Sequence, residues 1–335
     1  MKVTVFPKAN SIELADRPVP EVGEEDVLLR VHLCGICRSD VDAWQGKGLK
    51  QYPYSPGHEY CGVIEKTGPG VRGFEVGQRV VVDPNLSCGA CRFCMAGRPN
   101  LCDMLKLRTG KSNGGLAEYV VVNHRMVYLL PEGFPDVLAV FIEPLSCALH
   151  VAETASAQAG EQVVIFGGGL LGYLTALVLK SWCGEIVIVE PLDRRRENLR
   201  THLDVRAVAP DVLSALEREK GFGIAIDCSG NPAAVAQAVR ILGKGGRLVL
   251  AGLVMHARHA DISFVDITMK ELVLKGSWLN PRTFPKAIKL AVVNQGSLAA
   301  LETETFSLDH VHDAFERAKD PNAPKVLVRP LREGS

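Results

Sequence analysis

Residues 163–172 read Val-Val-Ile-Phe-Gly-Gly-Gly-Leu-Leu-Gly, and they decide the fold of the middle of the chain. Their four apolar residues predict a buried strand, and residues 170–180 have the periodicity of a helix. Gly167, Gly169 and Gly172 have the spacing G-x-G-x-x-G between these elements. Because glycine adopts tight turns and lets other groups approach the backbone, this order of strand, turn and helix predicts the start of a parallel α/β sheet.

The same texture extends over residues 147–277, where apolar runs alternate with stretches of helical periodicity. This alternation is typical of a doubly wound parallel sheet. The expected strands are 163–166, 186–190, 224–227 and 247–251.

Residues 1–146 have a different pattern, with short β-branched runs broken by Gly and Pro, and this favours an irregular, mostly β domain. Beyond Trp278, a helical segment at 284–293 and a final apolar run at 325–328 indicate a return to that first domain. We therefore expect one domain from 1–146 with 278–335, and a second from 147–277. The runs in the first part include 27–32, 78–82 and 119–122.

The glycine turn predicts a dinucleotide site, because the backbone N–H groups of Leu170 and Leu171 open a helix whose positive end favours a pyrophosphate. Glu190 ends the next strand about 20 residues further on, where a carboxylate accepts hydrogen bonds from a ribose and repels a 2′-phosphate. NAD is therefore favoured over NADP. Residues 194–196 are three arginines, and arginines near this position accommodate a 2′-phosphate, which argues for NADP.

Two later turns follow predicted strands of the same sheet, Cys228-Ser229-Gly230 and Ala251-Gly252-Leu253. The carboxyl ends of parallel strands meet at one edge, where ligands bind. We expect Ser229 and Leu253 to contact the ribose and nicotinamide, and ordinary loop chemistry is the alternative.

Four cysteines, Cys88, Cys91, Cys94 and Cys102, have the spacing C-x2-C-x2-C-x7-C on a stretch rich in Gly, Arg and Pro. Four thiolates close a tetrahedral shell around zinc and leave no open position, so a structural site is expected. A zinc ribbon, an iron–sulfur site and free thiols are the alternatives, but the Cys-Pro ending of a bacterial ferredoxin run is missing. The loop also lacks the basic, aromatic surround of a nucleic-acid module.

A second group of possible ligands is dispersed along the chain, with Cys37 and His58 on separate motifs and Glu143 in Glu143-Pro144-Leu145. A thiolate, an imidazole and a carboxylate would leave one zinc position open. An open zinc acts as a Lewis acid that holds an alcohol oxygen and lowers its pKa. Each residue alone is more often a packing residue, but together they predict a catalytic zinc.

Residues 57–71 match the signature G-H-E-x2-G-x5-G-x2-V of zinc-containing alcohol dehydrogenases. Over nearly its whole length the chain resembles the zinc-dependent medium-chain dehydrogenases, and Glu143-Pro144-Leu145 resembles the polyol branch. The resemblance implies a GroES-like catalytic domain, a Rossmann coenzyme domain, NAD, and two zinc ions per chain. It makes Cys37 and His58 ligands of the catalytic zinc and the four-cysteine loop the structural site. Glu143 ranks ahead of Glu59 as third ligand, with Glu59 beside the metal or exchanging onto it.

The resemblance also implies roles for neighbouring residues. Ser39 would take the alcohol proton, the alternative being a cap for a helix that begins two residues later. Several relatives have a histidine five residues after the zinc cysteine, whereas this chain has Asp42, which leaves the proton exit unassigned. Arg38 would pair with the coenzyme pyrophosphate, with a solvated arginine as the alternative, and Arg195 would flank the adenine.

Composition excludes other classes of protein. Lys plus Arg and Asp plus Glu both number 38, without a block of like charge, so no nucleic-acid partner is expected. The first ten residues lack the features of a signal peptide, and no run approaches about 18 apolar residues, so we expect a cytoplasmic protein without a membrane partner.

The expected reaction is the NAD-dependent oxidation of a secondary alcohol of a polyol, sugar or aminocyclitol to a ketone, including an aminocyclitol dehydrogenase of a biosynthetic pathway. A threonine or simple alcohol dehydrogenase is an alternative. A zinc-free enone reductase would lack Cys37 and the four-cysteine loop, and a non-catalytic NAD-binding structural protein would bind coenzyme without turnover. The family implies a homodimer or homotetramer joined partly near Trp278.

Overall fold

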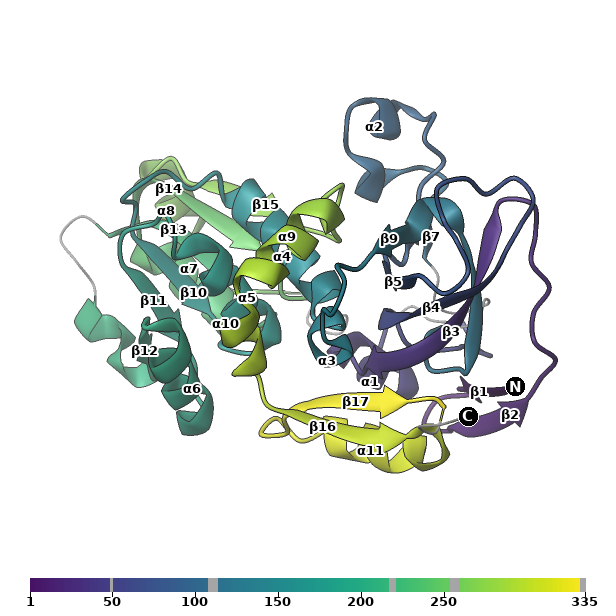
Figure 1. Ribbon diagram of the computed structural model, residues 1–335. Helices are drawn as coiled ribbons and strands as arrows, with labels where there is room; N and C mark the ends of the chain where they lie inside the picture. The colour runs from purple at the N-terminus through teal and green to yellow at the C-terminus, as the bar shows by residue number, and fades with distance from the viewer. Residues whose placement is uncertain (49–50, 108–113, 217–220, 254–258, 332–335) are drawn as a thin grey trace. The chain divides into compact units, whose positions relative to one another are not determined.

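The computed structural model describes residues 1–48, 51–107, 114–216, 221–253 and 259–331. The chain divides into two compact units, which we call the mixed-sheet unit (Met1–Glu143 with Phe284–Ser335) and the parallel-sheet unit (Pro144–Thr283). The domain limits predicted from the sequence, after residue 146 and before residue 278, differ from these by a few residues. Figure 1 shows the elements of both units.

The parallel-sheet unit is built on a six-stranded sheet with the order β12-β11-β10-β13-β14-β15. All neighbouring strands in it are parallel. The chain therefore builds outward from β10 to one edge and then from β13 to the other, as in the doubly wound fold that the sequence predicts. The strands are β10 (Val163–Phe166), β11 (Ile186–Val189), β12 (Arg206–Val208), β13 (Phe222–Asp227), β14 (Leu242–Leu250) and β15 (Val273–Gly276).

Helices connect these strands and cover the sheet (Figure 1). Every residue of β10 and β11 is buried, which is expected of parallel strands covered on both faces. The helix α5 is buried over eight of its ten residues, because it is apolar on nearly all sides. The helices are α4 (Ile142–Ala155), α5 (Leu170–Leu179), α6 (Asp193–Leu203), η3 (Pro210–Leu216), α7 (Pro232–Ile241) and α8 (Phe264–Met269).

The two ends of the parallel-sheet unit are hydrogen-bonded to each other. Asn280 Nδ2 donates to Ser146 Oγ at 2.8 Å, and Thr283 Oγ1 donates to the carbonyl oxygen of Ser146 at 2.8 Å. All three side chains are buried, so these bonds are shielded from water. The unit is thereby closed where the chain enters and leaves it.

The mixed-sheet unit contains a seven-stranded sheet with the order β16-β17-β3-β4-β5-β9, and β8 also pairs with β3. The strand β17 lies between β16 and β3, so residues 325–328 belong to the same sheet as the N-terminal strands. Figure 1 shows α11 against β16 and β17. The strands are β3 (Asp26–Gly35), β4 (Glu59–Thr67), β5 (Arg79–Val82), β8 (Tyr119–Asn123), β9 (Val127–Leu129), β16 (Thr303–Ser307) and β17 (Lys325–Arg329).

Smaller elements complete this unit. The strand β1 (Lys2–Val5) pairs with β2 (Glu13–Asp16), and β6 (Asn85–Leu86) pairs with β7 (Lys106–Leu107). The helices and 3-10 turns are α1 (Arg38–Trp44), α2 (Arg92–Met95), η1 (Pro99–Leu101), η2 (His124–Met126), α3 (Asp136–Ala139), α9 (Phe284–Val293), α10 (Gln295–Ala299), η4 (Leu308–His310) and α11 (Val311–Ala318).

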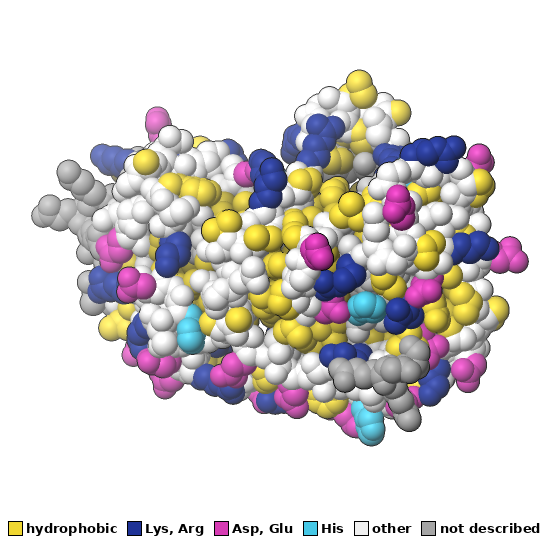
Figure 2. Space-filling model, in the orientation of Figure 1, with side chains coloured by type: hydrophobic (Ala, Val, Ile, Leu, Met, Phe, Trp, Pro, Cys, Tyr) yellow, Lys and Arg dark blue, Asp and Glu magenta, His cyan; other side chains and the backbone are white. Residues whose placement is uncertain are grey.

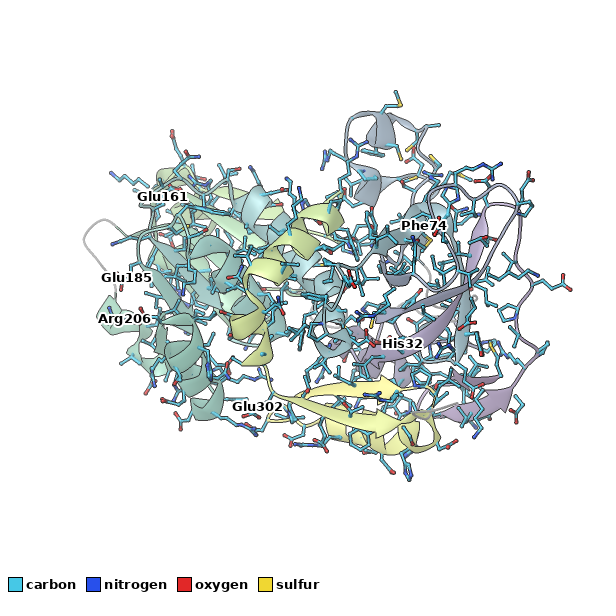
Figure 3. All side chains as sticks on the ribbon, viewed as in Figure 1. His32, Phe74, Glu161, Glu185, Arg206 and Glu302 are labelled. Atoms are coloured by element: carbon cyan, nitrogen blue, oxygen red, sulfur yellow. The ribbon has the colours of Figure 1, made fainter. Side chains whose placement is uncertain are left out.

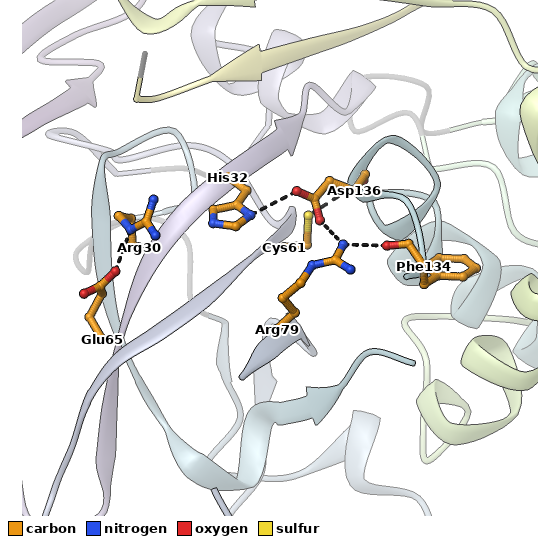
Figure 4. A network of polar contacts seen from close by, with 7 residues as sticks. All are labelled: Arg30, His32, Cys61, Glu65, Arg79, Phe134 and Asp136. Carbon is orange, nitrogen blue, oxygen red and sulfur yellow. Dashed lines mark hydrogen bonds and ion pairs between the residues drawn. The ribbon is translucent and has the colours of Figure 1, made fainter. Parts of the chain in front are cut away.

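A polar network fastens α3 to the sheet (Figure 4). Asp136 Oδ2 lies 2.9 Å from His32 Nδ1 on β3, and Oδ1 forms an ion pair with Arg79 on β5. Arg79 also donates to the carbonyl oxygen of Phe134, and Cys61 Sγ donates to that of Asp136. Burial would raise the pKa of Asp136, but the hydrogen bonds with His32 and Arg79 outweigh it and lower the pKa to about 2.

Charges of both signs are interspersed over the face that Figure 2 shows, in line with a formal net charge of zero. Some charges pair across elements, such as Arg206 of β12 with Glu185 at 3.2 Å (Figure 3). By length and composition, the helical stretch Asp136–Ala155 could cross a membrane, but 72% of its window is buried inside the protein. That burial is what a core helix of a globular domain has.

Candidate active site and metal centres

The four cysteines of the 88–102 loop converge. The Sγ atoms of Cys91 and Cys94 lie 3.6 Å apart, and those of Cys88 and Cys94 lie 3.9 Å apart. Thiolates at about 2.3 Å from a tetrahedral zinc are separated by about 3.8 Å, so these distances suit the ion. The ligand atoms of all four, Cys102 included, lie within 4.8 Å of one another.

Backbone N–H groups turn toward these sulfurs. The N–H of Cys91 donates to Cys88 Sγ at 3.3 Å, and the N–H of Cys88 donates to Cys102 Sγ at 3.3 Å. Hydrogen bonds from the N–H groups of Cys94 and Asp103 lower the pKa of Cys91 to about 6. Because zinc binds the thiolate, N–H groups that stabilise the thiolate of Cys91 fit the metal.

The second group of ligands lies where β3 ends and β4 begins. Cys37 is the N-cap of α1, two residues beyond β3, and His58 directly precedes β4, whose first residue is Glu59. The two strands are antiparallel and pair Gly35 with Glu59. The sheet register therefore brings the ligand atoms of Cys37, His58 and Glu59 within 4.8 Å of one another.

Asp40 supports this group, although no role was predicted for it from the sequence. Its carboxylate is fully buried and accepts hydrogen bonds from the N–H groups of Cys37 at 3.1 Å and Gly57 at 3.2 Å. Its Oδ2 also lies 3.5 Å from His58 Nδ1. An acidic residue three positions after an N-cap is a recognisable signal, because its side chain reaches back to the cap N–H.

The charges explain why the group suits a cation. Burial would lower the pKa of His58, but the negative charges of Asp40 and Cys37 outweigh it and hold that pKa well above its ordinary value. Burial would raise the pKa of Asp40, and His58 holds it below its usual range instead. A zinc ion would replace the proton on His58, and the set of sulfur, nitrogen and oxygen donors is one that zinc accepts.

Besides lying close to Cys37 and His58, Glu59 contacts a residue of a third segment, β17, and this contact was not predicted from the sequence. Lys325, at the start of β17, forms an ion pair with Glu59 Oε2 and donates to the carbonyl oxygen of Ile36 at 2.9 Å. Burial would lower the pKa of Lys325, but the charge of Glu59 outweighs it and raises that pKa. No local signal in the sequence points to this contact, since the two residues are joined only by the sheet.

Glu143 is not part of the group of three. It lies in α4, is buried, and its carboxylate does not come within 4.8 Å of all three other ligand atoms. The ranking of Glu143 ahead of Glu59 as third ligand therefore stays a prediction, and the geometry of the group favours Glu59.

The first turn of α1 carries the other predicted residues. The helix begins at Arg38 with Cys37 as its N-cap, so the alternative in which Ser39 caps a later helix is wrong. Ser39 is exposed. Arg38 is 61% exposed, and its Nε donates to Asp42 Oδ1 at 3.1 Å. Its role toward a pyrophosphate stays a prediction.

The glycine turn of the parallel-sheet unit has the crowding that its sequence implies. Gly167 has φ +97°, which favours glycine, and a Cβ on Gly172 would lie 1.9 Å from the carbonyl oxygen of Gly167. Gly169 is the N-cap of α5, which places Leu170 and Leu171 in the first turn of that helix. Their N–H groups belong to the free positive end that binds anions.

Glu190 is buried beside this turn. Its Oε2 accepts the N–H of Gly168 at 2.7 Å, and its Oε1 accepts the N–H of Leu192 at 3.0 Å. Arg195 Nη1 lies 3.7 Å from Oε2, whereas Arg196 donates to the carbonyl oxygen of Glu190 at 2.7 Å. Of the three arginines, Arg195 and Arg196 are thus held against Glu190.

The two later turns differ from each other. Ser229 follows β13 and donates from Oγ to Asp227 Oδ1 at 2.6 Å, so its hydroxyl is fixed. Leu253 is 65% exposed and is the last described residue before the gap at 254–258. Both coenzyme assignments stay predictions.

Comparison with known proteins agrees with these sites. Residues 23–132 match the alcohol dehydrogenase GroES-like domain, and residues 171–292 match the zinc-binding dehydrogenase domain. The chain belongs to the zinc-dependent medium-chain dehydrogenases. The predicted fold class is therefore confirmed, and the protein is an oxidoreductase of the NAD-dependent alcohol dehydrogenase class.

Its relatives act on different alcohols. The chain is 30% identical to the sorbitol dehydrogenase of Bacillus subtilis, covering 99% of this chain and 98% of that one. It is 32% identical to an L-threonine 3-dehydrogenase of Anaeromyxobacter dehalogenans, over 93% of each.

Solved structures give the same picture. An alcohol dehydrogenase of Escherichia coli CFT073 in complex with NADH is 31% identical with a TM-score of 0.90, over 98% of this chain and 99% of that one. A zinc-binding dehydrogenase of Sinorhizobium meliloti bound to NADP is 30% identical with a TM-score of 0.89, over the same shares.

Proposed function

We propose that this protein oxidises a secondary alcohol of a polyol, sugar or aminocyclitol to a ketone and reduces NAD, with zinc held by Cys37, His58 and a glutamate. The observation that carries the proposal is the convergence of one thiol, one imidazole and one carboxylate at a sheet end. Three protein ligands leave a fourth position for a substrate oxygen, unlike the closed four-cysteine site.

When bound, zinc polarises the alcohol oxygen and lowers its pKa. Asp40 Oδ2 pairs with His58 Nδ1, which leaves Nε2 of the ring for the metal and fixes the orientation of the ring. Ser39, exposed on the first turn of α1, is the group we assign to accept the hydroxyl proton. The glycine turn would hold the coenzyme, and a bound NAD would supply the nicotinamide that accepts a hydride from the alcohol carbon.

Glu190 supports NAD as the coenzyme. Its carboxylate is fixed by the N–H groups of Gly168 and Leu192, and a fixed negative charge at the end of β11 disfavours a 2′-phosphate. Arg195 argues for NADP, since a guanidinium accommodates that phosphate. The nearby carboxylate of Glu190, however, partly neutralises the charge of Arg195. We expect kcat/KM for NAD to exceed that for NADP, and Glu190→Ala to narrow the difference.

The substrate class rests on Glu143-Pro144-Leu145 and on the relationship to sorbitol dehydrogenase. The relationship to threonine dehydrogenases favours L-threonine as a second candidate. A panel of polyols, sugars, aminocyclitols, L-threonine and simple secondary alcohols, assayed by NADH absorbance, tests both. Turnover of L-threonine alone would overturn the first candidate, and coenzyme binding without turnover of any member would favour a structural protein.

We also propose a cytoplasmic homo-oligomer that forms at the free edge of the parallel sheet. β15 is one of the two edge strands, and Val273 in it and Trp278 just after it are each 44% exposed. An exposed apolar edge strand is a template for pairing with a second chain. Light scattering during size-exclusion chromatography should give a dimer or tetramer, and Val273→Lys should shift it toward the monomer. A monomeric native protein would overturn this proposal.

A further inference from the structure

Lys325 and Glu59 approach each other from two strands that both flank β3. β17 pairs with β3 through Leu327 and Gly35, and β3 pairs with β4 through Gly35 and Glu59. The N–H of Ile36 donates to the carbonyl oxygen of Val326 at 2.9 Å, which continues the pairing toward Cys37. The last strand of the chain therefore delivers an ammonium group to the metal ligands.

Gly35 provides the space for this contact. A Cβ at this position would lie 2.5 Å from Glu59 Oε2 and 2.9 Å from Lys325 Cε. The side chains of Lys325 and Glu59 thus meet directly above the glycine of the intervening strand. Any other residue here would put a Cβ within 3 Å of both side chains, so one of them would have to shift from its observed position.

The contact is shielded from water. The side chains of Lys325 and Glu59 are 11% and 2% exposed. Glu59 Oε2 has no hydrogen bond of ordinary geometry within the described residues, so Lys325 is the partner that this oxygen has. A buried carboxylate that loses its counter-charge is strongly destabilised and turns to another cation within reach. Beside Cys37 and His58, that cation is the metal.

We propose that Lys325 is a positioning residue for the metal centre, which holds one oxygen of Glu59 and thereby limits how strongly this carboxylate binds zinc. Lys325 keeps the zinc from being enclosed by Cys37, His58 and both oxygens of Glu59. The position that the substrate oxygen needs thus stays exchangeable. This inference rests on the proposed function, since it concerns the same zinc.

The test compares zinc release. Lys325→Met, Lys325→Arg, Glu59→Gln and the double variant Lys325→Met/Glu59→Gln are loaded with zinc, and release to a chelator is followed with a coloured indicator. Lys325→Met should lower the rate of release of the catalytic zinc by up to about 10-fold. A change of this size is typical of groups that orient metal ligands. Lys325→Arg should stay near the native rate, and the release phase of the four-cysteine site is the internal reference.

The double variant isolates the route through Glu59. If Lys325 acts only by repelling the ion, removing it slows release equally whether position 59 carries glutamate or glutamine, and the inference is overturned. If it acts through Glu59, the effect disappears in the double variant. Lys325→Gln replaces the methionine variant if that one fails to fold, and Lys2→Met, which removes an exposed lysine paired with Asp309, is the matched control.

Cobalt provides a second readout. With Co²⁺ in the catalytic site, Lys325→Met should weaken the visible d–d absorption, because an added oxygen ligand raises the coordination number, and Lys325→Arg should restore it. An unchanged spectrum together with an unchanged rate of zinc release overturns the inference about Lys325 and leaves the proposed function intact. A native protein that holds only one zinc per chain overturns the proposed function as well, so the two failures are distinguishable.

Discussion

The two metal centres of the mixed-sheet unit are built in opposite ways. In the four-cysteine loop every ligand comes from residues 88–102, all four are sulfurs, and their partners are backbone N–H groups. Where β3 ends and β4 begins, the ligands come from two separate segments, Cys37 after β3 and His58-Glu59 at the start of β4, and they differ in chemistry. Their partners are the charged side chains of Asp40 and Lys325.

The difference shows whether the metal or the protein fixes the arrangement of the ligands. In the loop, the four cysteines lie outside the hydrophobic core cluster of the mixed-sheet unit, so we expect the metal to organise the chain. At the strand ends, the sheet register holds Cys37, His58 and Glu59 whether or not a metal is bound, so the protein organises the metal. A loop folded around its ion closes the coordination shell, whereas a sheet can stop at three ligands and leave one position for chemistry.

The largest expected effect is the loss of the sheet-built centre. Cys37→Ser should reduce kcat by about 10³-fold or more, because the Lewis acid supplies several kcal/mol to the reaction. The far-ultraviolet circular dichroism should stay near that of the native protein, and metal analysis should find one zinc in place of two. Equal activity in both proteins would contradict the zinc assignment.

The complementary change tests the loop. Cys91→Ser should also remove one zinc, but here we expect the loop itself to unfold, with rapid proteolysis between residues 88 and 102 and a clearly lower melting temperature. Activity should suffer less than in Cys37→Ser. A variant that keeps its protease resistance without the metal would show that the loop does not depend on zinc.

A smaller effect is expected where a side chain only orients a ligand. Asp40→Asn should lower zinc affinity or kcat by about 10- to 100-fold, because the amide binds His58 Nδ1 less strongly than a carboxylate does. Equilibrium zinc binding and steady-state kinetics measure this. Asp309→Asn, which removes an exposed acid in the same unit, should change neither quantity.

The smallest effect concerns the polar network of α3, which belongs to neither centre. Asp136→Asn should lower the free energy of unfolding by about 1–2 kcal/mol at neutral pH, the low end for a charged hydrogen bond because Asp136 is 32% exposed. Its pKa is lowered from 3.8 to about 2, so its contribution is complete above pH 4 and is lost as the pH falls toward 2.

Denaturant unfolding at several pH values measures this contribution. The native protein should lose more stability than Asp136→Asn between about pH 4 and pH 2, and both should keep two zinc ions at neutral pH. The exposed Arg30 and Glu65 pair beside the network gives the control (Figure 4), since Glu65→Gln should cost less than about 1 kcal/mol. Parallel pH curves for the native protein and Asp136→Asn would refute the assignment.

Elements whose signals are local could be predicted from the sequence. Strand 163–166 and helix 284–293 match β10 and α9 residue for residue, because apolar periodicity and flanking breakers lie within each element. The expected strand 247–251 is only the second half of β14, which starts at Leu242, since glycines and charged residues at its start hide it from a hydrophobic pattern.

The candidate site was predictable to the same extent. Cys37, His58 and the four cysteines stand in motifs, so their convergence followed from spacing and resemblance. The contact of Lys325 with Glu59 did not, because it depends on the pairing of β17 with β3, and long-range register is not encoded in any one stretch. Asp40 lies between these cases, since its position after the N-cap was visible but its contact with His58 was not.

The place of β17 also bears on how the protein is made. During translation β3 and β4 leave the ribosome early, whereas β17 follows only after the whole parallel-sheet unit has been synthesised. Until then the stretch of β3 around Cys34 and Gly35 lacks the neighbour that it pairs with in the finished sheet. A nascent chain stalled within the parallel-sheet unit therefore exposes an unpaired apolar strand edge, which is a site for aggregation during that interval.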